Sequence, residues 1–287
     1  MRTLTKILVV VDTRLDTNIA LNRARLLAKA TDKPVFILAP NPHPSEATQA
    51  KMQDMLALLK DEGIDVKGQE AWHNGVVETI NHFTELEGCS LVIKAAKKSS
   101  MITNVISTPE DWTLLRHSQE PVLLVHHDHS WMNGRVLAAV DACPNDSEHE
   151  VLNGVILEYA AAIAGISDSE CHIGSAHPGT TLSGDDPISK SSADTHVRYE
   201  QQCQPLAKRF AIADEHVHIE EGPAEAFIPT LCKRINASLL VMGTVAHTSL
   251  RIELLGDTAE QILNNIETDI LCVKPLDIME PLEKLMK

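Results

Sequence analysis

The sequence has few aromatic side chains and few basic ones. Aromatic residues make up 3% of its 287 positions, and 25 Lys and Arg stand against 40 Asp and Glu, for a formal net charge of −15 at pH 7. A chain this acidic repels the phosphate backbone of nucleic acids and anionic lipid headgroups, and it offers few rings on which bases could stack. The composition therefore argues against direct binding of nucleic acid.

Long apolar runs and paired cysteines are also missing. No apolar stretch approaches the roughly 20 residues that a helix needs to cross a bilayer, and the first apolar run is not preceded by a signal-peptide pattern. The six cysteines include no Cys-x-x-Cys pair, which favours reduced, buried thiols over a disulfide framework or a zinc knuckle. We expect a cytoplasmic protein without membrane insertion.

Three catalytic motifs are absent, namely His-Glu-x-x-His, Gly-x-Ser-x-Gly and Gly-x4-Gly-Lys-[Ser/Thr]. Zincin, serine hydrolase and P-loop NTPase interpretations therefore lack their core residues. His126, His127 and His129 around Asp128 suggest a metal site, but strand alternation sends the first two to opposite faces, and a metal needs several convergent ligands. No metal is expected.

The chain contains the same pattern twice. The apolar run Ile7–Val11 is closed by Asp12, and the run Val136–Val140 is closed by Asp141. A repeat of this length is a duplicated domain, because solenoid units are far shorter. We predict one domain over residues 1–130 and a second over residues 134–278.

Each half alternates strands with helices five times. The predicted strands are Ile7–Asp12, Pro34–Ala39, Asp65–Trp72, Ser90–Ala95 and Pro121–His126, then Arg135–Asp141, Cys171–His177, His216–Glu221, Ser238–Gly243 and Asp269–Lys274. Apolar stripes at helical spacing are formed by Ala20, Ala24, Leu27 and Ala28, by Met52, Met55, Leu56 and Leu59, and by Val151, Val155, Ile156, Tyr159 and Ile163. Alternating strands and helices predict an α/β fold with two tandem, doubly wound, parallel five-stranded sheets.

Ligands of such sheets bind beyond the carboxyl ends of the strands, beside helix N-termini that attract anions. In the second half, this edge holds Asp141, the segment Gly243–Ala246 and the segment Gly256–Glu260. Here the sequence resembles the universal stress proteins of the tandem type, over nearly the whole chain. The resemblance implies an adenine nucleotide alpha hydrolase-like fold, association of the fifth strands Pro121–His126 and Asp269–Lys274, and a homodimer of tandem chains.

Nucleotide-binding members of that family carry Gly-x2-Gly-x9-Gly-[Ser/Thr], whose amides and hydroxyl hold the phosphates. An aspartate at the end of the first strand and a small apolar residue at the end of the second contact adenosine. The positions that match are Gly243 and Gly256 for the first and third glycines, Asp141 for the aspartate, and Ala176 for the apolar residue. The resemblance therefore implies ATP, ADP or AMP as the ligand of the C-terminal half.

Two positions depart from the family pattern. Ala246 replaces the second glycine, which adds a methyl group where the backbone should approach a phosphate. Asp257 replaces the hydroxyl residue and, with Glu260, predicts a capping box that closes the helix N-terminus; Thr258 offers a hydroxyl instead. The phosphate loop of this half is therefore partial.

The first half has diverged further. Lys94 aligns with Gly243, and the segment Ser107–Glu110 stands near the place of Gly256–Thr258, so that Pro109 is expected to open a helix after Thr108 as its N-cap. Only Asp12 of the family's nucleotide contacts persists. A nucleotide is not the expected ligand here.

Three functions fit these observations. The first is a stress-response protein that binds an adenine nucleotide or another small molecule without strong catalysis. The second is a slow ATP hydrolase, which needs a metal-held water or a base near the γ-phosphate. Only His247 and Asp257 offer themselves for that role. The third is a protein-interaction module with vestigial pockets, whose acidic surface and Gly179–Asp194 segment would recognise a partner.

Overall fold

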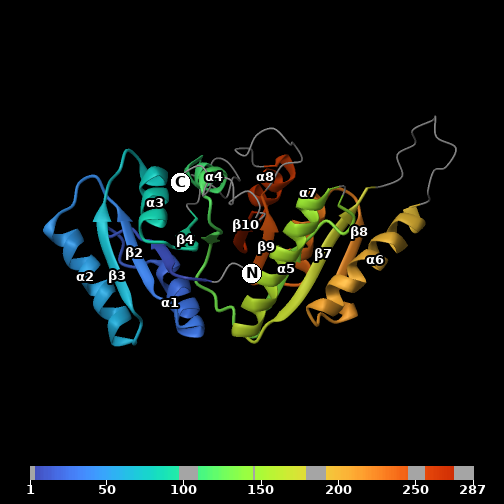
Figure 1. The fold of residues 1–287 in the computed structure, drawn as a ribbon, viewed down its shortest axis with the longest axis horizontal. Helices are drawn as coiled ribbons and strands as arrows, with labels where there is room; N and C mark the ends of the chain where they lie inside the picture. Colours follow the sequence, from blue (N-terminus) through green and yellow to red (C-terminus); the bar gives the residue numbers. More distant parts are fainter. Residues whose placement is uncertain (1–3, 97–108, 145, 179–191, 245–255, 275–287) are drawn as a thin grey trace, which may run out of the picture. The chain divides into compact units, whose positions relative to one another are not determined.

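The computed structural model describes residues 4–96, 109–144, 146–178, 192–244 and 256–274. The chain divides into two compact units. Unit 1 comprises Met1–Asp128 with Asp269–Cys272, and unit 2 comprises His129–Thr268 with Val273–Lys287. In Figure 1, helices lie against the strands within each unit.

Unit 1 is built on a parallel sheet. Its elements in chain order are β1 (Ile7–Val10), α1 (Ile19–Thr31), β2 (Val35–Pro40), α2 (Glu46–Asp61), β3 (Val66–Ala71), α3 (Val76–Leu86), β4 (Leu91–Ala95), α4 (Pro109–His117) and β5 (Val122–Val125). The strand order is β3-β2-β1-β4-β5, with every neighbouring pair parallel. The chain therefore winds outward from β1 in both directions, as predicted for a doubly wound sheet.

Unit 2 repeats this plan. It contains β6 (Arg135–Ala139), α5 (Ser147–Ile166), β7 (Glu170–His177), α6 (Ser192–Arg209), the 3₁₀ helix η1 (Asp214–His216), β8 (Val217–Glu221), α7 (Ala224–Arg234), β9 (Leu239–Gly243) and α8 (Asp257–Asn264). The strand order is β9-β6-β7-β8, again parallel. The predicted α/β fold class with mostly parallel strands is confirmed.

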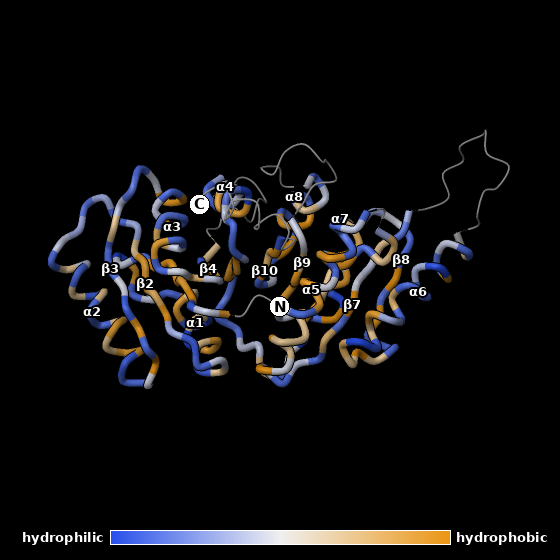
Figure 2. The backbone as a smooth tube through the Cα atoms, viewed as in Figure 1, coloured by the Kyte–Doolittle hydropathy of each residue, from blue (hydrophilic) through white to orange (hydrophobic). Residues whose placement is uncertain are grey.

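Apolar side chains form the core of each unit. Figure 2 shows hydrophobic stretches along the strands, and β1, β5 and β10 (Asp269–Val273) are buried throughout. The predicted stripe of α1 is buried at all four positions, and that of α2 at Met52, Leu56 and Leu59. In α5 the prediction is wrong at Val151, which is 38% exposed because it lies near the start of the helix, on the solvent side.

Strand β10 comes from the end of the sequence but belongs to unit 1 over Asp269–Cys272. It runs antiparallel to β5, with Leu124 opposite Ile270 and Val122 opposite Cys272. The association of the two fifth strands, which the family resemblance implied, is therefore present.

A buried ion pair holds the start of β10. Asp269 is fully buried and accepts the Nε–H of Arg23 at 2.8 Å and the backbone N–H of His126 at 2.8 Å. Arg23, itself 3% exposed, also donates to the carbonyl of His127 at 3.1 Å. A charge removed from water needs such a complete set of partners.

The remaining predictions from composition concern thiols and membranes. All six cysteines lie within the described ranges, and none of them forms a disulfide bond there. Burial raises the pKa of Cys89, Cys203 and Cys232 to about 12, so these thiols stay protonated at neutral pH. Among the described residues, we find no helix with the length and apolar character required to cross a bilayer.

We predict that Asp269→Ala destabilises β10 strongly, by about 3–5 kcal/mol, because it leaves the Arg23 guanidinium buried without its carboxylate. Native-state hydrogen exchange of the β5 and β10 amides measures this without assuming that the whole chain unfolds in one step. The control is Asp16→Asn, which removes an exposed pair with Lys51 and should leave the exchange of these amides nearly unchanged. Equal effects of the two substitutions would contradict the role of Asp269.

Candidate functional site

Asp141 lies just beyond the end of β6, at the carboxyl edge of the unit 2 strands. Its backbone N–H donates to Asn153 Oδ1 at 3.1 Å, and Asn153 Nδ2 donates back to the Asp141 carbonyl at 2.6 Å. The Asp141 carboxylate accepts the N–H of Cys143 at 3.0 Å. Among the described residues, no side chain donates to this carboxylate, which therefore keeps acceptor capacity for a ligand.

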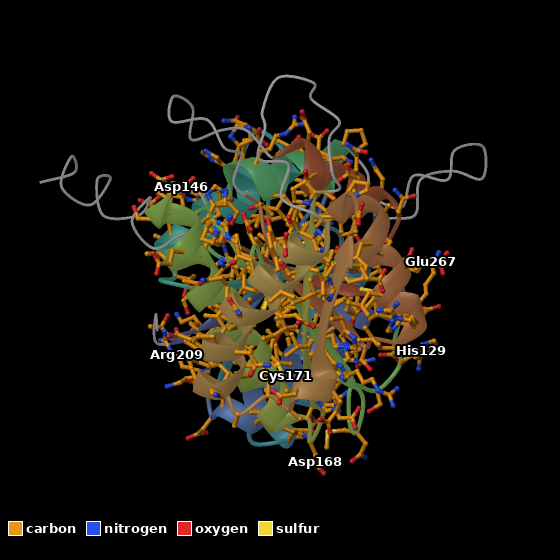
Figure 3. All side chains as sticks on the ribbon, turned by 90° about the vertical axis from the view of Figure 1, so that its right-hand side faces the viewer. His129, Asp146, Asp168, Cys171, Arg209 and Glu267 are labelled. Carbon is orange, nitrogen blue, oxygen red and sulfur yellow. The ribbon has the colours of Figure 1, made fainter. Side chains whose placement is uncertain are left out.

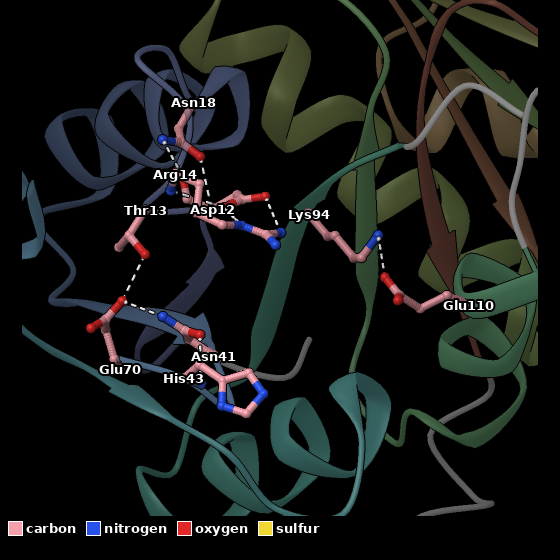
Figure 4. Close-up of polar contacts among 9 residues, drawn as sticks. All are labelled: Asp12, Thr13, Arg14, Asn18, Asn41, His43, Glu70, Lys94 and Glu110. Carbon is pink, nitrogen blue, oxygen red and sulfur yellow. Dashed lines mark hydrogen bonds and ion pairs between the residues drawn. The ribbon is translucent and has the colours of Figure 1, made fainter. Parts of the chain in front are cut away.

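Unit 1 has the same turn with a different outcome. Asp12 and Asn18 exchange the equivalent hydrogen bonds, at 2.9 and 3.3 Å. However, the Arg14 guanidinium donates two hydrogen bonds, of 2.8 and 2.7 Å, to the two oxygens of the Asp12 carboxylate, as Figure 4 shows. The ion pair engages both carboxylate oxygens of Asp12, whereas the described residues give the Asp141 carboxylate one backbone donor, the Cys143 N–H.

A second carboxylate at the carboxyl edge of the unit 1 strands also accepts hydrogen bonds from within the unit. Glu70 on β3 accepts hydrogen bonds from Thr13 at 2.7 Å, Asn41 at 3.0 Å and Thr48 at 2.9 Å (Figure 4 shows the first two). Burial alone would raise the pKa of Glu70, but these three donors outweigh it and hold the pKa below its usual range. Glu70 thus links a residue that follows β1, Thr13, to one that follows β2, Asn41.

The predicted alignment of Lys94 with Gly243 is wrong by one residue. Lys94 pairs with Val10 and Met242 pairs with Ala139, and these partners lie two positions before Asp12 and Asp141. Lys94 is therefore the counterpart of Met242, and Ala95 that of Gly243. The sequence alone did not fix this register, because β4 and β9 are short strands in which almost every residue is apolar. A shift of one residue therefore leaves the apolar pattern almost unchanged.

Lys94 is a buried cation held by helix α4. Its ammonium lies 2.6 Å from Asp111 Oδ1 and 3.3 Å from Glu110, and the Lys94 and Asp111 side chains are 4% and 0% exposed (Figure 4 shows the Glu110 contact). The Ala96 N–H donates to the carbonyl of Val125, as that of Thr244 does to Val273, so Val125 and Val273 are counterparts. Fourteen residues before them stand Asp111 and Ala259, which therefore correspond to each other. An ion pair in unit 1 thus occupies the place of two buried apolar residues, Met242 and Ala259, in unit 2.

Gly243 ends β9 and has a packing reason to be glycine. A Cβ there would lie 2.4 Å from a methyl carbon of Leu152 on α5. The next residue, Thr244, is 3% exposed, and its hydroxyl is buried with no hydrogen-bond partner in the described part of the chain. An unsatisfied hydroxyl at this edge indicates a polar partner outside those residues.

Helix α8 begins at Asp257, after Gly256 as its N-cap. The predicted capping box is wrong, since the N-cap residue is glycine and no side chain caps the helix. Asp257 and Thr258 are exposed in the first turn, where an acidic side chain is stabilised by the helix dipole. In unit 1, Pro109 opens α4 as predicted, whereas Thr108 lies outside the described residues.

The other predicted site residues fall in different places. Ala176 is half-buried near the carboxyl end of β7, opposite Glu220 of β8. Ala246 and His247, and the Gly179–Asp194 segment up to position 191, lie outside the described residues. The structure therefore brings Asp141, Ala176, Gly243 and Gly256 to the carboxyl edge of the strands of unit 2.

Sequence reasoning missed a group of rings at this edge. His177 ends β7 at 1% exposure, its Nε2 lies 3.2 Å from His196 Nδ1, and its ring centroid lies 5.5 Å from that of Tyr199 on α6. Burial and the nearby Asp141 raise the pKa of Tyr199, so the phenol stays protonated. The only sequence signal was the position of His177 at the end of a predicted strand.

Comparison with known proteins agrees with this architecture. The profile of the universal stress protein family matches residues 3–126 and again residues 132–274. Universal stress protein E of Escherichia coli (strain K12) is 30% identical over 229 residues, which cover 77% of this chain and 72% of that protein. The homologue in Haemophilus influenzae is also 30% identical, over 219 residues, 74% of this chain and 71% of that protein.

Solved structures show the same likeness. A protein of unknown function from Pseudomonas aeruginosa PAO1 has a TM-score of 0.87 and 36% identity, with 99% of this chain and 97% of that chain covered. A universal stress protein from Archaeoglobus fulgidus DSM 4304 has a TM-score of 0.61 and 19% identity, covering 94% and 96%, which shows the fold alone. The fold class is a tandem pair of α/β stress-protein domains. The chain belongs to the universal stress protein family.

We predict that Lys94→Met and Asp111→Ala each destabilise the protein by about 3 kcal/mol, because each leaves its partner's charge buried. The double variant copies the apolar pair of unit 2 and should regain most of that loss. Urea unfolding of the four proteins completes a double-mutant cycle. A double variant whose loss equals the sum of the two single losses would show that the charges do not depend on each other.

Proposed function

We propose that this chain is a cytoplasmic stress-response protein that binds an adenine nucleotide in unit 2, through Asp141, Ala176, Gly243, Gly256 and Thr258, without strong catalysis. The observation that carries the proposal is the contrast between two equivalent aspartates. Arg14 donates to both carboxylate oxygens of Asp12, whereas in the described part of the chain the Asp141 carboxylate accepts one backbone N–H. A ribose or an adenine amino group would complete the acceptor set of Asp141.

The phosphates would lie against the start of α8. The first N–H groups of this helix have no side-chain cap, and Gly256 has no Cβ to crowd an approaching anion. The helix dipole favours negative charge at this end. Asp257 opposes it, so we expect affinity below that of family members with a hydroxyl residue at this position.

The base would contact the rings that follow β7. Tyr199 is half-buried, lies against His177 and stays protonated, so it offers both an aromatic face and a hydroxyl donor to a purine. The buried hydroxyl of Thr244 supplies a further polar contact beside Gly243. These groups support a nucleotide-sized ligand with a planar ring at one end and negative charge at the other.

The family resemblance also implies that two chains pair. We propose this homodimer as well as the ligand. Native mass spectrometry of protein taken directly from cells tests both, because it reports the oligomer and any co-purified nucleotide in one spectrum. A spectrum that shows only single chains without nucleotide, at protein concentrations above those in cells, would count against both.

We predict that Asp141→Asn lowers the affinity for ATP about tenfold, since it removes a charge-assisted hydrogen bond. Equilibrium dialysis with labelled ATP measures this, with Asp12→Asn as the matched control in unit 1. The control should bind like the unmodified protein. No detectable binding at millimolar ATP, or an equal loss in both variants, would exclude the proposed site.

We predict that Asp257→Ser raises ATP affinity by roughly fivefold to tenfold, because it removes a negative charge beside the phosphates and restores a hydroxyl donor. Isothermal titration at low and high salt tests the electrostatic origin, as the gain should shrink when salt screens the charge. Glu267→Ser removes an exposed carboxylate elsewhere in unit 2 and is the control for net charge. A gain as large in the control would attribute the effect to net charge alone.

A further inference from the structure

A second polar cluster lies at the opposite edge of unit 2, where β7 and β8 begin. It is formed by Glu170 and His172 on β7, His216 in η1 and His218 on β8. Potential ligand atoms of Glu170, His172 and His216 all lie within 4.8 Å of one another. Within the described residues, this is the one group of three or more His, Cys, Asp and Glu side chains gathered so closely, and it includes none of the three histidines at positions 126, 127 and 129.

The arrangement follows from strand geometry. Alternate residues of a strand share a face, so Glu170 and His172 lie together, and His216 and His218 are spaced in the same way. The register of β7 on β8, with Gly174 opposite His218, brings the two pairs side by side. In Figure 3, Cys171, which separates Glu170 from His172, lies toward the Asp168 end of the unit, away from Asp146 at the start of α5.

His172 is the centre of the cluster and is incompletely bonded. Its residue exposure is 5%, its Nδ1 lies 3.0 Å from His218 Nε2, and its Nε2 is buried without a hydrogen-bond partner in the described chain. The group nearest to that Nε2 among its charged neighbours is Glu170 Oε2, at 3.6 Å. Buried polar atoms of this kind normally have a partner, so the His172 Nε2 atom calls for one.

Glu170 does not supply that partner, because its carboxylate oxygen at 3.6 Å lies beyond the distance of a normal N–H···O hydrogen bond. His172 Nδ1 already faces His218 Nε2 at 3.0 Å, so Nε2 is the ring atom left for a further partner. With the ring proton on Nδ1, Nε2 presents a lone pair beside the lone pairs of the Glu170 carboxylate, an arrangement that a cation would bridge.

We propose that Glu170, His172 and His216 bind a divalent transition-metal ion of the zinc type. Two imidazoles and one carboxylate are a donor set that suits zinc, and a hydrogen bond from the non-coordinating nitrogen of a ligand histidine to a neighbour is the usual way to orient the ring. His218 fills that positioning role toward His172. Glu170 is exposed and His216 is half-buried, so an ion can enter and water can complete its coordination.

The ligand atoms must close in slightly around the ion. Zinc bonds of about 2.0–2.1 Å place tetrahedral ligand atoms roughly 3.4 Å apart. The ligand atoms of Glu170, His172 and His216 lie within 4.8 Å of one another in this structure, so the largest separation must shorten. Glu170 is able to move, because it lies at the first position of β7 and half of its side chain is exposed. Its carboxylate also accepts Arg135 Nε at 2.9 Å, so the guanidinium competes with the metal for this ligand.

The test uses the full-length protein, freed of metal with a chelator and titrated with Co²⁺ and then Zn²⁺. We expect one equivalent of bound Co²⁺ with visible absorption bands typical of low coordination number, displaced by Zn²⁺. His216→Asn and Glu170→Gln, both at the surface of the cluster, should weaken binding at least tenfold, and His172→Asn should abolish it. His218→Asn should weaken it by about tenfold or more through loss of ring orientation. His43→Asn, an exposed histidine of unit 1, should leave it unchanged.

Two further readouts distinguish metal bound at this cluster from metal bound elsewhere on the chain. Zn²⁺ should raise the melting temperature of the unmodified protein in proportion to its affinity, and should not do so in Glu170→Gln. Arg135→Gln should tighten binding, because it removes the competing cation. Near-ultraviolet charge transfer from thiolate to Co²⁺, unchanged binding in the three ligand variants, or the absence of any bound ion would each overturn the proposal.

Discussion

Each unit depends on a turn of the same kind after its first strand. In that turn, the backbone N–H and carbonyl of an aspartate form hydrogen bonds with the side-chain amide of an asparagine. Asn18 is the N-cap of α1, whereas Asn153 lies inside the longer α5, yet each asparagine donates to and accepts from the backbone of Asp12 or Asp141. The amide closes the turn and thereby sets where the carboxylate projects. Everything that a ligand would meet at this edge is placed relative to that turn.

From the same turn the two units diverge in their use of charge. In unit 1 the carboxylates are matched internally, Asp12 by Arg14 and Asp111 by Lys94. In unit 2 the counterparts of the second pair are Met242 and Ala259, and the Asp141 carboxylate has one backbone donor within the described ranges. A carboxylate that already has partners within the fold gains little from a ligand. The two copies of the domain therefore differ in the acceptor capacity that their described residues leave for one.

Sequence reasoning predicted the elements well, since apolar periodicity reports burial directly. All ten predicted strands are present, within two residues at each end, and Pro109 opens its helix. Sequence reasoning failed at two points where a shift of one residue matters, namely the strand register of Lys94 and the N-cap of α8. Lys94 was placed against Gly243, although the sheet pairs it as the counterpart of Met242. Asp257 and Glu260 matched a capping box, although the helix begins one residue earlier than that motif requires. The close approach of Leu152 gives Gly243 a packing role that no spacing rule could reveal.

By itself, the sequence determined that the chain is a duplicated α/β protein of the universal stress family, because repeats, periodicity and glycine spacing are properties of residue order. Tertiary structure alone decided which charges are satisfied. Arg23 pairs with Asp269 and Lys94 pairs with Asp111, although 246 and 17 residues separate the partners along the chain. Charge and hydrogen-bond partners act over a few ångströms, and the fold, not the order of residues, sets those distances.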